Sequence, residues 1–141
     1  MNVNVGENLP AELIEYLTNP EKYSLRYNDN YEIRLFKNDE FILILRLCYY
    51  NSSILNLDEP KKQKGYYIFS YVKSVGSVIS LDNKSNLENI IDINSCDEMI
   101  LSKKCLIEFD LATQVVYDTI KTGRLSNKIK WIFEGDFSLY N

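Results

Sequence analysis

The stretch FILILRLCYY, residues 41–50, carries the strongest strand pattern in the sequence. Successive side chains of a strand point to opposite faces of a sheet, so odd and even positions form two separate rows. The even row includes Arg46 and Cys48, whereas every odd position is apolar or aromatic. We therefore expect the odd row to lie in the core: Phe41, Leu43, Leu45, Leu47 and Tyr49.

Two further strand patterns flank this stretch. Tyr31, Ile33 and Leu35 alternate with polar residues shortly before it. Residues 37–40, between the two runs, contain the Asn and Asp that tight hairpin turns favour, so these runs predict an antiparallel pair. Residues 65–72, which follow, are rich in aromatic side chains, and we expect both faces of that strand to be at least half covered.

Helical patterns lie near both ends of the chain. Residues 9–17 place leucines and an isoleucine at helical spacing, and Pro20 marks the end of this helix. Near the C-terminus we expect Asp110 to cap a second helix, because a carboxylate accepts bonds from the free N–H groups of the first turn. Gly123 stands where a positive φ costs least, just after that helix.

These elements predict an α+β fold in a single domain spanning residues 1–141. We expect an antiparallel sheet of about four to six strands, with the N-terminal helix and the C-terminal helix (about 110–122) packed on it. The last strand alternates Ile129, Trp131 and Phe133, and we expect Trp131 and Phe133 in the core. Residues 73–104 predict loops with one or two short strands.

The composition of the chain indicates its cellular location and excludes some classes of partner. The N-terminus has no signal-peptide pattern and no apolar run reaches the roughly 20 residues that span a bilayer, which predicts a cytoplasmic protein without membrane contact. Cys48, Cys96 and Cys105 are an odd number without close pairing, so we expect all three to be reduced. A net charge of −4 repels phosphates, and we expect no nucleic-acid partner.

The sequence lacks the usual groups of catalysis. It contains no histidine, which removes the commonest general base and metal ligand. No phosphate-binding glycine loop, dinucleotide fingerprint or calcium loop occurs. We therefore expect no catalytic residue, no metal site and no cofactor, and a protein that is not an enzyme.

The C-terminal third carries a family resemblance. The run from Ile107 to Ala112, a following amphipathic helix, the pair Thr122-Gly123, and Trp131 eight residues after the glycine resemble the closing motif of the type-one immunity proteins of bacterial polymorphic toxin and contact-dependent inhibition systems. Two positions where that family often has proline carry Glu108 and Ser126 here. The resemblance covers about residues 105–133, and its motif residues are Asp110, Ala112, Gly123 and Trp131.

The resemblance implies a protein that binds the C-terminal domain of a cognate toxin, often a nuclease or a nucleic-acid deaminase, and blocks it. Such a toxin needs a basic cleft for phosphates, so acidic residues could steer and occlude it, and tyrosines could supply contact area. The candidate partner-binding residues are Asp39, Glu40, Asp58, Glu59, Asp92, Asp97, Glu98, Tyr50 and Tyr67.

Two other functions remain open at this point. A small-molecule-binding α+β module would need a deep apolar cavity, whereas a filled core would favour toxin binding. An adaptor in another protein assembly is the third possibility, and only the genomic neighbourhood or a pull-down separates it from an immunity protein. The sequence leaves open which toxin is bound, whether the toxin's active site is covered, the oligomeric state, and the role of residues 73–104.

Overall fold

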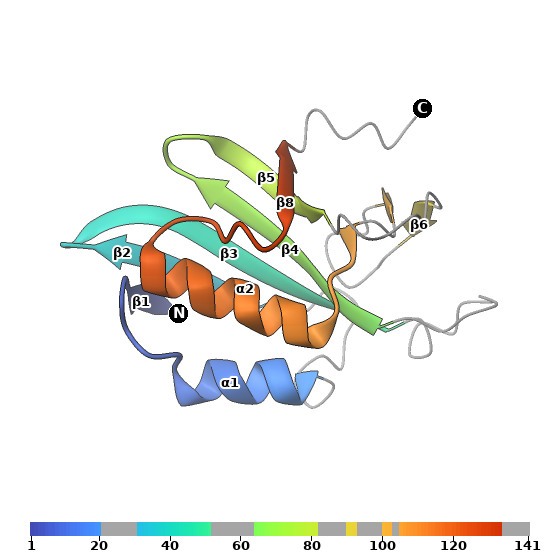
Figure 1. Ribbon diagram of the computed structural model, residues 1–141, viewed down its shortest axis with the longest axis horizontal. Coiled ribbons are helices and arrows are strands. Elements are labelled where there is room, and N and C mark those ends of the chain that lie inside the picture. Colours follow the sequence, from blue (N-terminus) through green and yellow to red (C-terminus); the bar gives the residue numbers. More distant parts are fainter. Residues whose placement is uncertain (21–30, 52–63, 82–89, 93–99, 103–104, 134–141) are drawn as a thin grey trace.

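A six-stranded sheet with the strand order β1-β2-β3-β4-β5-β8 forms the centre of the computed structural model (Figure 1). The structure describes residues 1–20, 31–51, 64–81, 90–92, 100–102 and 105–133. The sheet strands are β1 (Asn2–Asn4), β2 (Tyr31–Lys37), β3 (Glu40–Asn51), β4 (Lys64–Val72), β5 (Gly76–Leu81) and β8 (Lys130–Phe133). With the helices α1 (Ala11–Thr18) and α2 (Phe109–Thr122), they confirm the predicted α+β class.

The sheet is mixed because of its first strand. β1 runs parallel to β2, whereas every other neighbouring pair is antiparallel. A three-residue strand carries too little alternation to be seen in the sequence, so β1 was not predicted. Between β5 and α2, the short strands β6 (Ile90–Asp92) and β7 (Ile100–Ser102) pair with each other. With β5, the region from 73 to 104 therefore contains three strands among its described residues, more than expected.

Both helices contribute to one hydrophobic core on one face of the sheet (Figure 1). The central strands supply Leu43, Leu45, Leu47 and Tyr49 to it, as predicted. Leu13 and Leu17 of α1, and the buried row of α2, pack against them. The buried row of α2 is Ala112, Val115, Val116, Thr119 and Ile120.

Phe41 does not join that core, which corrects the prediction from strict alternation. Leu35 pairs with Leu43, but the next residue of β2, Phe36, pairs with Phe41, so the register shifts by one residue. Such a bulge moves a side chain to the other face of the sheet. Ile42 packs against the core cluster instead, and the Phe41 ring lies against the rings of Phe36 and Tyr71.

The ends of α2 differ in how closely they follow the prediction. The N-cap is Glu108, without a side-chain cap bond, and Asp110 lies in the first turn, so Asp110 is not the capping residue. Its carboxylate still stands near the positive end of the helix dipole. At the C-terminal end, Gly123 adopts φ 75° and its N–H bonds to the carbonyl oxygen of Thr119 at 2.9 Å, as expected for a glycine cap.

The two aromatic residues of β8 have different environments. Trp131 is half-buried, packs against the core, and donates its indole N–H to the carbonyl oxygen of Ser126 at 2.8 Å. Phe133 is 46% exposed, so the expectation that it lies in the core was wrong. It is the last residue of β8 and pairs with Val78 of β5.

The cysteines also depart from the prediction. Cys48 is disulfide-bonded, whereas Cys105 is a free, fully buried thiol. Burial raises the pKa of the Cys105 thiol to about 12, because an apolar environment disfavours the thiolate. Cys96 lies outside the described residues. The expectation of three reduced cysteines is therefore wrong at Cys48.

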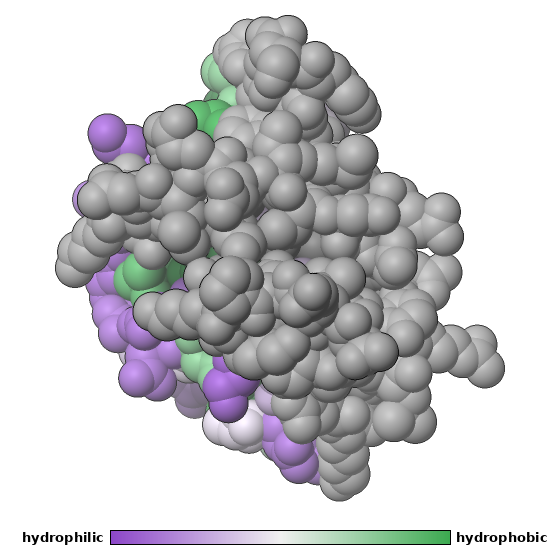
Figure 2. Space-filling model, turned by 90° about the vertical axis from the view of Figure 1, so that its right-hand side faces the viewer, coloured by the Kyte–Doolittle hydropathy of each residue, from purple (hydrophilic) through white to green (hydrophobic). Residues whose placement is uncertain are grey.

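The described helices are too short and too polar to cross a bilayer. Seen from one side, the visible part of the described surface is mostly hydrophilic, with small separate hydrophobic patches (Figure 2). A surface of this kind offers contact sites for a partner only where an apolar patch and charged residues lie together.

Candidate interaction surfaces

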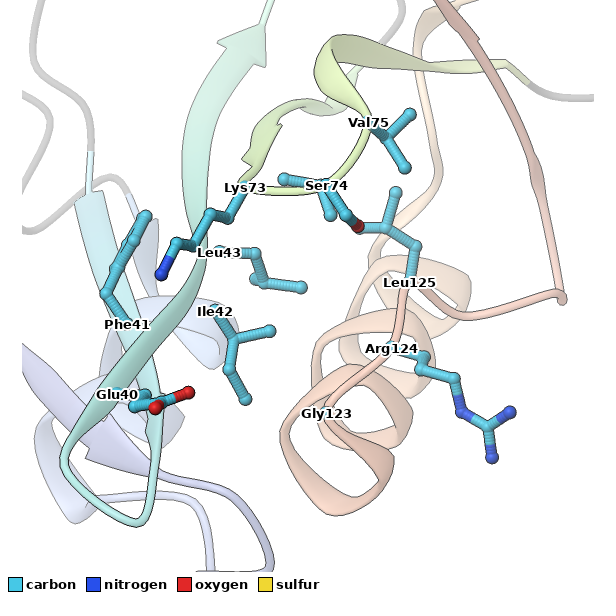
Figure 3. Close-up of a pocket in the computed structure, with 11 residues that line it drawn as sticks. Glu40, Phe41, Ile42, Leu43, Lys73, Ser74, Val75, Gly123, Arg124 and Leu125 are labelled. Atoms are coloured by element: carbon cyan, nitrogen blue, oxygen red, sulfur yellow. The ribbon is translucent and has the colours of Figure 1, made fainter.

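An open groove lies at one end of the sheet, where three connections meet (Figure 3). The start of β3, the β4–β5 turn (73–75) and the link after α2 (123–125) form its walls. The groove has a volume of about 640 Å³. Its apolar lining comes mainly from Phe41, Ile42, Leu43, Val72, Val75 and Leu125.

Backbone bonds hold the groove walls in place. Asn38 and Asp39 turn β2 into β3 with φ values of 51° and 65°, a conformation these two residue types tolerate. The N–H of Lys73 bonds to the carbonyl oxygen of Ile42 at 3.0 Å, which ties the β4–β5 turn to β3. A further N–H bond, from Val75 to Val72 at 3.0 Å, closes that turn. The groove is therefore formed before any partner arrives.

Charged side chains stand on opposite sides of the groove. Figure 3 shows Glu40 on the β3 side and Arg124 on the side of the link that follows α2. Lys73 extends along the β3 side as well. A second hollow of about 410 Å³ lies beside the same link and shares Arg124 and Leu125 with the groove. Asp118 of α2 contributes to this second hollow.

The outer surface of the helices is acidic. We call residues 7–18 and 108–122 the helix layer; its charged residues are six carboxylates and one lysine: Glu7, Glu12, Glu15, Glu108, Asp110, Asp118 and Lys121. All are exposed except Asp118, which is half-buried. Two apolar side chains protrude from this layer, Ile14 at 46% exposure and Tyr117 at 49%. Lys121 places its ammonium group 5.7 Å from the Tyr117 ring centroid.

The strands of the six-stranded sheet have the opposite balance. They carry two acidic residues, Glu32 and Glu40, and five basic ones: Arg34, Lys37, Arg46, Lys64 and Lys130. Glu32 pairs with Arg34 at 3.2 Å and with Arg46 at 3.8 Å. Negative charge among the described residues is thus concentrated on the helix layer.

The predicted partner-binding residues are only partly brought together. Asp39 and Glu40 are exposed at the tip of the β2–β3 hairpin, and Glu40 lines the groove. Asp92 lies in β6, and nothing is described of its side chain. The remaining four acidic candidates, Asp58, Glu59, Asp97 and Glu98, lie outside the described residues.

Tyr50 and Tyr67 were predicted to face a partner. The structure corrects this prediction, because both side chains have 0% exposure. Their rings contact each other edge to face at a centroid distance of 5.8 Å. A side chain without accessible surface offers a partner no contact area. Both tyrosines therefore act in packing.

Another group of tyrosines is structural as well. The Tyr66 hydroxyl donates to the carbonyl oxygens of Tyr16 at 3.1 Å and Leu17 at 3.3 Å, and thereby fastens the end of α1 to β4. Rings of Tyr16, Tyr49 and Phe109 surround Tyr66. Burial in this cluster, with smaller contributions from its two tyrosine neighbours, raises the pKa of Tyr66 far above its ordinary value.

Sequence reasoning missed the acidic helix layer. Its signal was present, because Glu12, Glu15 and Asp118 occupy the polar positions of two helical patterns. The acidic candidates predicted from the sequence were mostly neighbouring pairs in turns, whereas the acidic residues of the helix layer are mostly single and spaced along the helices. The groove had no sequence signal, because its walls come from three distant segments.

Among the described residues, no three metal-binding side chains lie close enough to hold an ion. The chain matches no protein-family model, no curated protein and no solved structure. The likeness to immunity proteins therefore depends on the motif in residues 105–133 alone.

Proposed function

We propose that this chain is an immunity protein that binds and neutralises a cognate toxin domain of the nuclease or nucleic-acid deaminase class. The acidic helix layer is the observation that carries this proposal. An enzyme that acts on nucleic acid needs a basic cleft, and a complementary acidic surface attracts such a cleft over several ångströms.

The helix layer suits both steps of such binding. Its carboxylates would steer the encounter, toward ~10⁸ M⁻¹s⁻¹ at low salt, which limits the time that a newly made toxin stays active. Ile14 and Tyr117 would then provide the desolvated contacts that slow dissociation. Inhibition would be steric and electrostatic occlusion, without catalysis or a cofactor.

The family motif supports the proposal through its structural roles. Ala112 is fully buried on the sheet-facing side of α2, and Gly123 ends that helix. The indole of Trp131 holds the link that connects the helix to β8. These residues would fix the position and the end of α2, and the outer surface of α2 would contact the toxin.

We further propose that binding takes place in the cytoplasm of the producing cell. A disulfide at Cys48 is unusual in that reducing compartment. Because Cys48 is fully buried, its thiol would pack as a small apolar side chain after reduction. Toxin binding should therefore be measured with and without reductant, and we expect complexes in both conditions.

The direct test mixes the purified chain with the toxin domain encoded immediately upstream. We expect a stoichiometric complex, loss of the toxin's activity, and an association rate that falls as salt rises. No complex at micromolar concentration would end the proposal. So would an upstream gene that encodes no separate C-terminal domain.

Charge variants locate the steering surface. Glu12→Gln with Glu15→Gln raises the net charge by two on the helix layer, and should slow association several-fold at low salt. Asn2→Lys with Ser77→Lys raises it by the same amount at exposed positions of the sheet. We expect the second pair to slow association less, and equal effects would contradict a role for the helix layer.

A small-molecule-binding module is the second candidate, and the groove is the observation that favours it. Its volume of about 640 Å³ lies in the ordinary range for ligand sites. Its openness weighs against this function, because a bound small molecule would stay partly in water. Saturable binding of a metabolite-sized apolar compound, abolished by Val75→Asp, would support this candidate.

A further inference from the structure

We propose that the groove receives a protruding segment of the toxin domain, which carries a large apolar side chain next to a lysine or arginine. The inference rests on the proposed function and adds the site and chemistry of the main contact. It is carried by three properties of the groove: its shape, its charge and its position beside α2.

The shape of the groove fits part of a protein. About 640 Å³ accommodates a large side chain and its neighbours, and the lining is mainly apolar. Val75, at 52% exposure, stands at the open edge, where it would be covered only by a partner that extends beyond the groove. The surrounding protein surface of a toxin would exclude water from the inserted side chain, as the outer contacts of an interface do around its central residues.

The carboxylates of the hairpin tip select the residue next to the inserted side chain. Glu40 lies on the β3 side, and Asp39 precedes it at the hairpin tip. A basic residue of the toxin can pair with these carboxylates while the adjacent apolar side chain enters the groove. Lys73 and Arg124 also line the groove and would repel that basic residue, so it would lie at the hairpin tip beside Asp39 and Glu40 while the apolar side chain points inward.

The groove adjoins the acidic helix layer. The link after α2 borders both the groove and the second hollow, and Asp118 of the helix layer borders that hollow. One continuous face would therefore attract a basic toxin and hold its protruding segment. Because the walls are already fixed by backbone bonds, little ordering is needed on binding.

The first test removes the apolar edge. Val75→Asp should weaken binding of the upstream-encoded toxin domain at least tenfold, mainly through faster dissociation, because the inserted side chain would meet a carboxylate. Ser77→Asp adds the same charge to the same hairpin, but Ser77 borders a shallow hollow with Tyr71 and Arg46 rather than the groove. This control should change the dissociation constant less than threefold.

The second test reverses the charge. Glu40→Lys should weaken binding about tenfold, the order expected for the loss of a central ion pair and the gain of repulsion. Asn2→Lys with Ser77→Lys makes the same change of two charge units at exposed positions outside both the groove and the helix layer, so this pair controls for net charge. We expect the pair to slow association only modestly.

The outcomes separate the two proposals. If the wild-type chain forms no complex with the toxin domain, both the function and the groove assignment fail. If it forms a complex that Val75→Asp and Glu40→Lys leave unchanged, the function stands and the groove assignment is overturned. The assignment is also overturned if the aromatic anionic dye 8-anilinonaphthalene-1-sulfonate saturates the groove at micromolar concentration without competing with the toxin.

Discussion

The central strands β3 and β4 are closed at one end and open at the other. At the closed end, Tyr49, Tyr50, Tyr66 and Tyr67 are all buried, on both faces of the sheet. At the groove end, Phe41, Ile42 and Val72 remain half-buried, although the residue types are just as apolar. The difference is one of coverage by the rest of the chain, since both ends are rich in large hydrophobic or aromatic side chains.

Two features help to close this end on the side of the helices. Ile107 bridges to Tyr66 through two backbone bonds of 2.8 Å, which draws the segment before α2 onto the edge of β4. Gly65 permits this approach, because it has no side chain. At the other end α2 stops at Gly123, and the bulge in β3 turns Phe41 away from the helices.

Tyrosine content is a poor guide to an interface in this chain. The tyrosines of the closed end give the chain its aromatic character, yet they have no surface to offer. The end available to a partner is lined by aliphatic side chains. Substitutions at the closed end should therefore lower the free energy of unfolding most, and substitutions at the groove end should lower it least.

The largest effect is expected at Gly65. Gly65→Ala should lower the free energy of unfolding by about 3 kcal/mol, because its Cβ would collide with the carbonyl oxygen of Ile107 and the backbone must move. Gly6→Ala is the control: it meets open space and only the strain of φ 88°, worth about 1 kcal/mol. Urea unfolding measures both, and equal losses would contradict the close approach.

Tyr66 should have the next largest effect. Tyr66→Phe removes the hydroxyl that bonds to the carbonyl oxygens of Tyr16 and Leu17, and should cost about 1–2 kcal/mol. Tyr71→Phe, at an exposed position, should stay within about 0.5 kcal/mol. If both substitutions cost the same, the bond to the end of α1 contributes nothing.

Alkaline pH should weaken the closed end selectively. In the unfolded chain Cys105 and Tyr66 lose their protons near pH 9 and 10, whereas burial raises the pKa of both groups in the folded chain. The unfolded state therefore releases protons first, so stability is full below pH 9 and falls as the pH rises toward 12. Tyr66→Phe should make this fall shallower, which urea unfolding at increasing pH would measure.

The smallest effect on stability is expected at the groove. Val75→Asp should change the free energy of unfolding by less than about 0.5 kcal/mol, because Val75 is exposed and closes no core contact. Thermal unfolding is a sufficient measurement. A loss as large as that of Tyr66→Phe would show that the groove edge is structural, and its binding data could then not be attributed to lost contacts.

Much of the fold was predictable from local patterns. Alternation gave β2, β3, β4 and the core row Leu43, Leu45 and Leu47, and helical spacing with Gly123 gave α2. The errors lie where one residue changes the outcome. A bulge reversed the face of Phe41, and the helix begins two residues earlier than predicted, so that Glu108 is the N-cap in place of Asp110.

The candidate surfaces were harder to predict. Glu40 was predicted from its charge, and it does line the groove. The apolar lining could not be predicted, because Ile42, Val72 and Leu125 come from three segments that lie far apart in the sequence. The prediction that Tyr50 and Tyr67 face a partner was wrong, because the aromatic content of a strand does not indicate which side chains are exposed. The acidic helix layer was visible only as isolated carboxylates until the helices were placed side by side.

Amide hydrogen exchange of the chain, free and bound to the upstream-encoded toxin domain, tests this account most directly. If the groove end is the binding end, protection should appear at residues 40–43, 72–75 and 123–125 and along the outer surface of α2. Exchange at residues 64–68 and 105–109 should stay as slow as in the free chain. New protection confined to those closed-end residues, or none at the groove, would contradict the account.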